Sequence, residues 1–147
     1  MTIQEKLSNE GSIAEIMERL GKNARAAART LATVPTDAKD KALLEGAKAL
    51  RNGCAEILAA NAKDMKAAEE KGLSAALLDR LLLTEDRVGA MASGLEAIAE
   101  LPDPVGDVMT EWDRPNGLEI SRVRVPLGVI GIIYESRPNV TADASSL

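Results

Sequence analysis

The sequence VPLGVIGIIYESRPNVTAD occupies residues 125–143 and changes character half-way along. Its first part is a run of Val, Ile, Leu and Gly without polar alternation, which is typical of a β-strand buried on both faces. A polar segment, residues 135–139, follows, and after it come residues that can begin a helix. Open α/β sheets bind ligands at the carboxyl ends of their strands. We therefore expect residues 135–139 to carry the chemistry.

The composition indicates a globular protein that does not bind nucleic acid. Of its 147 residues, 46% are hydrophobic and 28% are charged, and the net charge is −5, which argues against a nucleic-acid or anionic-membrane surface. There is no histidine and one cysteine, Cys54, so a Cys/His zinc site and an intrachain disulfide are excluded. Residues 1–9 lack the apolar core of a secretory signal, and the run around Ile130 is too short to span a bilayer. We expect a cytoplasmic protein.

Helical periodicity and capping residues predict an α-helical amino-terminal half that ends at Pro104. Ser12 and Glu15 have the spacing of a capping box, and the apolar stripe after them predicts a helix over about residues 13–32. Thr36, Asn61, Ser74 and Thr84 are expected to be the N-cap residues of later helices, and one helix is expected to end at Gly72 in a left-handed conformation. The helix that begins near Thr36 is expected to continue through Gly53.

Residues 105–125 have the pattern of a β-hairpin. The turn dipeptide Asn116-Gly117 lies between two apolar segments. The apolar positions of the second segment change parity between Ile120 and Val123, which suggests a bulge or a strand that passes from one environment to another. The strand expected after the hairpin has no neighbour within the sequence. We expect either the front part of a larger α/β protein or a strand that pairs with another chain.

Several motifs resemble gamma-glutamyl phosphate reductase, also called glutamate-5-semialdehyde dehydrogenase, of the aldehyde dehydrogenase superfamily. The segment PLGVIGIIYESRPNVT, residues 126–141, is similar to the signature of that family. Upstream, the motifs NAKD (61–64), GLS (72–74), LDRL (78–81) and DPVG (103–106) match the family in the same order. The resemblance covers roughly residues 39–147. Its YESRPNVT part is specific, because the wider superfamily carries a different sequence after the same strand.

The resemblance implies an aldehyde dehydrogenase-like α/β architecture. It assigns residues 1–104 to the helical part of the cofactor-binding domain and residues 105–125 to the hairpin of an oligomerisation element. Residues 126–147 then form the first strand and helix start of a Rossmann-like cofactor sheet. It also implies a homo-oligomer and raises glutamate 5-kinase as a partner.

The resemblance also implies a reaction. In the family, a cysteine thiolate attacks gamma-glutamyl phosphate and phosphate leaves. The resulting thioester takes a hydride from NADPH and gives glutamate 5-semialdehyde, in proline biosynthesis. Cys54 does not match the context of that nucleophile, because it lies among helical core positions in the sequence RNGCAE. We therefore expect no reductase activity from this chain alone. The alternative is a non-catalytic module that associates with a partner chain through its helices or hairpin.

Four residues after the expected strand are the candidate site residues. In the superfamily, an asparagine after this strand supports the developing oxyanion, which Asn139 could do; the alternative is a helix N-cap. Arg137 could bind a carboxylate or phosphate bidentately, or it could pair with Glu135 or another nearby acid. Glu135 and Ser136 are expected to contact the substrate or the nicotinamide, or to be turn residues. No metal site is expected.

Overall fold

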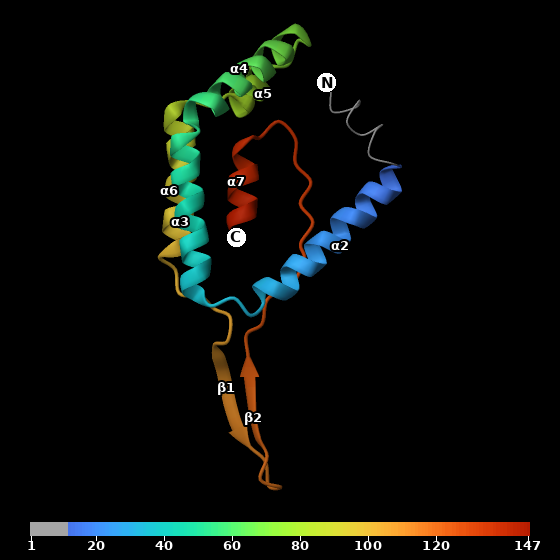
Figure 1. Ribbon diagram of the computed structural model, residues 1–147, viewed down its shortest axis with the longest axis vertical. Helices are drawn as coiled ribbons and strands as arrows, with labels where there is room; N and C mark the ends of the chain where they lie inside the picture. Colours follow the sequence, from blue (N-terminus) through green and yellow to red (C-terminus); the bar gives the residue numbers. More distant parts are fainter. Residues whose placement is uncertain (1–11) are drawn as a thin grey trace. The chain divides into compact units, whose positions relative to one another are not determined.

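A computed structural model describes residues 12–147, so the prediction made for residues 1–9 lies outside the described residues. Among residues 12–147, the structure has six α-helices and one two-stranded antiparallel sheet (Figure 1). The elements are α2 (Ile13–Leu31), α3 (Thr36–Asn52), α4 (Cys54–Glu70), α5 (Ala75–Leu81), α6 (Glu85–Ala99), β1 (Val108–Asp113), β2 (Glu119–Val123) and α7 (Asn139–Ser146). They form two compact units. One holds α2 with residues 104–131, and the other holds residues 35–103 with 132–147. The predicted domain boundaries stay predictions.

The core of the second unit lies where α3 and α6 pack together. Its buried residues form two clusters, Ala47 with Ala92 and Leu95, and Leu83 with Val88 and Met91. Small side chains let the two helices approach closely. A Cβ atom added to Gly46 would lie 3.1 Å from Cδ2 of Leu95, tighter than ordinary van der Waals contact. Ala142 of α7 packs against both clusters, which fixes α7 on this core.

Four predictions about helix ends are confirmed, among them Ser74 as the N-cap residue of α5. The Ser12–Glu15 capping box is present at α2, and the Thr84 hydroxyl accepts a hydrogen bond from the Arg87 N–H at α6. Gly72 has φ of +71°, the left-handed conformation expected after α4. The expected passage of a helix through Gly53 is wrong, because α3 ends at Asn52 and α4 begins at Cys54.

Two of the predicted caps are wrong. Pro35 is the N-cap of α3, and the Thr36 hydroxyl instead donates to Asp103. Asn61 begins no helix: it lies inside α4 and is 4% exposed. Its Nδ2 donates to the Leu81 carbonyl and its Oδ1 accepts from the Leu83 N–H, both at 2.8 Å. An amide carries both a donor and an acceptor, so Asn61 satisfies two backbone groups of the link between α5 and α6.

The predicted hairpin is confirmed in the first unit. Its register pairs Val108 with Val123 and Thr110 with Arg122, so Met109 is an extra residue in β1. The irregularity suggested by the sequence is therefore present, but its extra residue lies in the first strand rather than the second. Gly117 closes the turn with φ of +81°, a conformation that glycine adopts without strain.

The prediction of a buried strand over residues 125–134 is wrong for this structure. The segment is extended but unpaired, and Leu127 is 90% exposed. A strand can be buried only when its backbone N–H and C=O groups have partners. Within residues 12–147 the only strands are β1 and β2, which pair with each other. Gly128 also turns the backbone, with φ of +93°.

The observed fold class is therefore mostly helical with one antiparallel hairpin. None of the helices between residues 12 and 147 has the length and apolar character needed to cross a bilayer.

Candidate functional site

A cavity of about 420 Å³ lies in the second unit, beside the link between α5 and α6 and the start of α7. Its floor includes Leu82, Leu83 and Met91, and Leu83 and Met91 belong to the core. Its polar lining consists of Asp79, Arg80, Arg87, Arg137, Asn139 and Asp143. Of the four predicted site residues, Arg137 and Asn139 thus come together here, whereas Glu135 and Ser136 do not line the cavity.

The loop that carries these residues is held in a specific conformation. The hydroxyl oxygens of Tyr134 and Thr141 are hydrogen-bonded at 2.7 Å across the loop. Ser136 has φ of +52°, a left-handed conformation that costs a non-glycine residue free energy and is often found at functional sites. The loop therefore turns sharply and delivers Arg137 to the start of α7.

Asn139 does not cap α7. The N-cap is Pro138, and Asn139 is the first helical residue. Its Nδ2 donates to Oδ2 of Asp143 at 2.9 Å. A side-chain amide has two N–H donors, so the bond to Asp143 orients the amide and leaves one donor for another acceptor. The cap alternative is therefore wrong, and the oxyanion role stays a prediction.

Arg87 and Arg137 differ in what they bind. Arg87 donates to the main-chain oxygens of Asp79 and Leu82, and its Nη2 lies 2.9 Å from Oδ1 of Asp79. These contacts hold the end of α5 against α6. Arg137 makes no ion pair within the part of the chain that the structure describes, so the expected pairing with Glu135 is not formed.

Sequence reasoning missed Arg80, Arg87 and the two aspartates of the cavity. Arg80 lies in the last turn of α5, where a cation is expected from the helix dipole alone. Nothing in its local sequence sets it apart from a solvated surface residue. The only signal was its place in the LDRL motif, residues 78–81, which served to recognise the family and not to assign a role.

The sequence placed Cys54 in the middle of a helix, but in the structure Cys54 is the first residue of α4. It is partly buried and packs against the cluster of Leu83, Val88 and Met91, which confirms a core role. It does not line the cavity. Within residues 12–147 no group of three or more cysteine or acidic side chains is placed to hold a metal ion.

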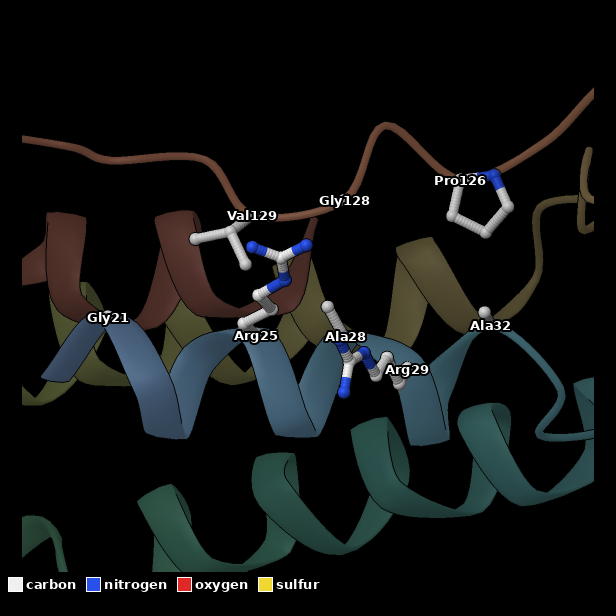
Figure 2. Close-up of a pocket in the computed structure, with 8 residues that line it drawn as sticks. All are labelled: Gly21, Arg25, Ala28, Arg29, Ala32, Pro126, Gly128 and Val129. Atoms are coloured by element: carbon white, nitrogen blue, oxygen red, sulfur yellow. The ribbon is translucent and has the colours of Figure 1, made fainter. Parts of the chain in front are cut away.

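A second hollow, of about 520 Å³, lies in the first unit between α2 and residues 126–129. Figure 2 shows Pro126, Gly128 and Val129 passing over α2, with the Arg25 side chain extending toward them. The hollow is lined mainly by apolar atoms and contains none of the predicted site residues.

The comparisons with known proteins point to one family. No protein-family model matches the chain. The chain is 65% identical over 132 residues to gamma-glutamyl phosphate reductase of Paramagnetospirillum magneticum, covering 90% of this chain and 31% of that protein. It is 60% identical over 136 residues to the enzyme of the same name from Moorella thermoacetica, covering 92% of this chain and 32% of that protein.

Solved structures agree. The crystal structure of gamma-glutamyl phosphate reductase from Thermotoga maritima matches with a TM-score of 0.83 and 45% identity, covering 86% of this chain and 30% of that one. The structure from Saccharomyces cerevisiae matches with a TM-score of 0.82 and 36% identity, covering 87% of this chain and 33% of that one. The chain thus spans about a third of the length of the proteins it matches.

Proposed function

Because the chain is homologous to the amino-terminal third of gamma-glutamyl phosphate reductase, we propose that it forms that part of an NADPH-dependent reductase. The reductase converts gamma-glutamyl phosphate to glutamate 5-semialdehyde and phosphate, in proline biosynthesis. The observation that carries the proposal is the 65% identity over 132 residues to the Paramagnetospirillum magneticum enzyme. The specific YESRPNVT sequence, residues 134–141, supports it.

In this proposal the residues after the extended segment act on the substrate. Arg137 binds an anionic group of gamma-glutamyl phosphate through its guanidinium. Asn139 donates its free amide N–H to the oxygen that becomes negative during thiolate attack. Glu135 and Ser136 contact the substrate or the nicotinamide. The shared cavity of Arg137 and Asn139 supports the first two roles. The nucleophilic cysteine comes from the remaining two thirds of the reductase, because Cys54 packs in the core.

Gly128 and Gly131 do not form the glycine-rich turn of a dinucleotide-binding fingerprint. Gly128 and Gly131 lie in the extended segment, and a pyrophosphate is bound by a glycine-rich turn between a strand and a helix. NADPH binding therefore belongs to the assembled reductase, in which residues 126–134 become a strand of the cofactor sheet. The apolar side chains of this segment, now exposed, are suited to that burial.

The same exposed segment supports a second candidate function. A chain of this length that associates with a partner through residues 125–133 would act without catalysing a reaction. The apolar residues Leu127, Ile130 and Ile133 are more than half exposed, and such a surface is normally covered. The hairpin gives a further surface for assembly into a homo-oligomer.

A chimera separates these two functions. In the chimeric reductase, this chain replaces the amino-terminal third of the Paramagnetospirillum magneticum enzyme. We expect phosphate-dependent reduction of NADP⁺ with glutamate 5-semialdehyde, measured by absorbance at the reduced nicotinamide band, and no turnover from this chain alone. Asn139→Ala should lower kcat of the chimeric reductase by about a hundredfold, as loss of one oxyanion donor does. Asn52→Ala, at the exposed end of α3, is the matched control. A folded chimera without turnover would favour the non-catalytic function.

A further inference from the structure

We propose that Arg80 and Arg137 together form a binding site for an oxyanion, a phosphoryl or carboxylate group, in the cavity beside α7. The inference rests on the proposed function for the identity of the natural ligand, whereas the site itself is argued from the cavity. The sequence alone assigns no function to Arg80. In the structure, Arg80 and Arg137 line the same cavity although they lie 57 positions apart in the sequence.

The charges of the cavity favour an anion. Three guanidinium groups and two carboxylates line it, in a chain whose net charge is −5. Both carboxylates are already used. Asp79 is 2.9 Å from the Arg87 guanidinium, and Asp143 accepts from the Asn139 amide at 2.9 Å. Asp143 keeps its negative charge when it accepts from a neutral amide, so three guanidinium groups and two carboxylates leave the cavity with a net charge of +1.

Arg80 and Arg137 differ from other arginines in the same unit. Arg51 pairs with Glu96 at 2.6 Å, and Arg87 pairs with Asp79. Between residues 12 and 147 the structure shows no ion pair for either Arg80 or Arg137. Guanidinium groups bind carboxylate and phosphate through parallel N–H donors. Because Arg80 and Arg137 are exposed and line the same cavity, the proposed site holds one oxyanion between them.

The surrounding contacts give the site a fixed frame. Arg80 is in the last turn of α5, whose end Arg87 ties to α6 through main-chain oxygens. Arg137 directly precedes Pro138, the N-cap of α7, and α7 is packed on the core through Ala142. Arg87 is thus a positioning residue that holds one half of the site.

The direct test is anion binding by the chain, followed by NMR of arginine Nε–Hε groups. Inorganic phosphate and glutamate are titrated separately at constant ionic strength, with chloride as the control anion. We expect saturable shifts at Arg80 and Arg137 and none at Arg114 of the hairpin turn. Arg80→Gln and Arg137→Gln should each weaken binding about tenfold, the loss expected for one charge-assisted hydrogen bond. Arg80→Lys should keep part of the affinity, and Arg114→Gln should keep all of it.

The comparison of phosphate with glutamate identifies which group of the natural ligand occupies the site. Saturation by phosphate alone assigns the site to the phosphoryl end of the substrate, saturation by glutamate alone assigns it to a carboxylate, and either result supports the proposal. Equal shifts at all arginines, or wild-type affinity in folded Arg80→Gln, would overturn it.

The chimeric reductase distinguishes this inference from the proposed function. An active chimera whose KM for phosphate and for glutamate 5-semialdehyde is unchanged by Arg80→Gln overturns the oxyanion site and leaves the reductase function standing. An inactive chimera with the binding pattern above overturns the function and leaves the site standing. Circular dichroism of each variant confirms that it is folded before its affinity is interpreted.

Discussion

The packed pair α3 and α6 and the extended segment 125–133 both contain many apolar residues, yet only the helix pair contributes buried side chains. Val88 of α6 is 1% exposed, whereas Val125 is 76% exposed. The helices satisfy their own backbone hydrogen bonds and need only an apolar neighbour to be buried. The extended segment needs both an apolar neighbour and a paired strand. An apolar sequence therefore shows which residues can be buried. Whether they are buried depends on whether their backbone groups have hydrogen-bond partners.

Buried backbone groups of the helical unit also need partners, and Asn61 supplies two of them. Its replacement should therefore give the largest loss of unfolding free energy. Asn61→Ala removes the partners of the Leu81 carbonyl and the Leu83 N–H. Two unsatisfied backbone groups near the core should cost about 3 kcal/mol of unfolding free energy. Urea denaturation measures the loss, and Asn52→Ala at the exposed end of α3 is the matched control. Equal losses in the two variants would show that the Asn61 bonds contribute nothing.

A matched pair of valines tests the comparison directly. Val88→Ala removes two methyl groups from the most completely buried large side chain of the core and should cost about 2 kcal/mol. Val125→Ala should change the unfolding free energy by less than about 0.5 kcal/mol, as exposed substitutions usually do.

The difference between these two effects should become smaller in the chimeric reductase. If residues 125–134 become a buried strand there, Val125→Ala should become destabilising by about 1 kcal/mol or more. Thermal unfolding measures these effects for Val88→Ala and Val125→Ala, each made in this chain and in the chimeric reductase and compared with the unsubstituted protein. A Val125→Ala effect that stays near zero in an active chimera would contradict the assignment of the segment to the cofactor sheet.

Features predicted correctly from the sequence depend on residues a few positions apart. The Ser12–Glu15 capping box, the Thr84 cap and the Gly72 helix end each involve partners within three residues, or a single backbone angle. Asn61 was misread as a cap because its true partners lie 20 and 22 residues away. The general preference of Asn for N-cap positions does not distinguish a capping Asn from one that, like Asn61, bonds distant backbone groups.

The candidate site shows the same limit. Residues 135–139 were expected to carry the chemistry because they follow an apolar run, and two of them, Arg137 and Asn139, do line a cavity. Arg80 could not be found from the sequence, because Arg80 and Arg137 come to line one cavity only in the folded chain. The burial of residues 125–134 could not be judged from composition either, since burial depends on strands that residues 12–147 do not supply.

The loop before α7 should respond less than the core. Tyr134→Phe removes the hydroxyl that is bonded to Thr141 at 2.7 Å. Because the bond is exposed, its loss should cost about 0.5–1 kcal/mol. Thr141→Val should cost a similar amount, and the double variant should cost less than the sum, because both changes remove one bond. Additive effects in urea denaturation would show that the bond does not hold the loop.

The smallest effect belongs to the exposed start of α2, where water competes with the capping box. The Ser12 backbone N–H, and then its hydroxyl, donate to the Glu15 carboxylate and lower the pKa of that group below its ordinary value of 4.5. A carboxyl with a lowered folded pKa contributes stability above its unfolded pKa and loses it as the pH falls through its folded pKa. Helix α2 should therefore fray at its start only below about pH 4.5. NMR titration of the Glu15 side chain measures the shift, and Glu15→Gln should remove this pH dependence while Glu18→Gln preserves it. A Glu15 pKa at or above 4.5 would mean that the carboxylate is not held by Ser12 in solution.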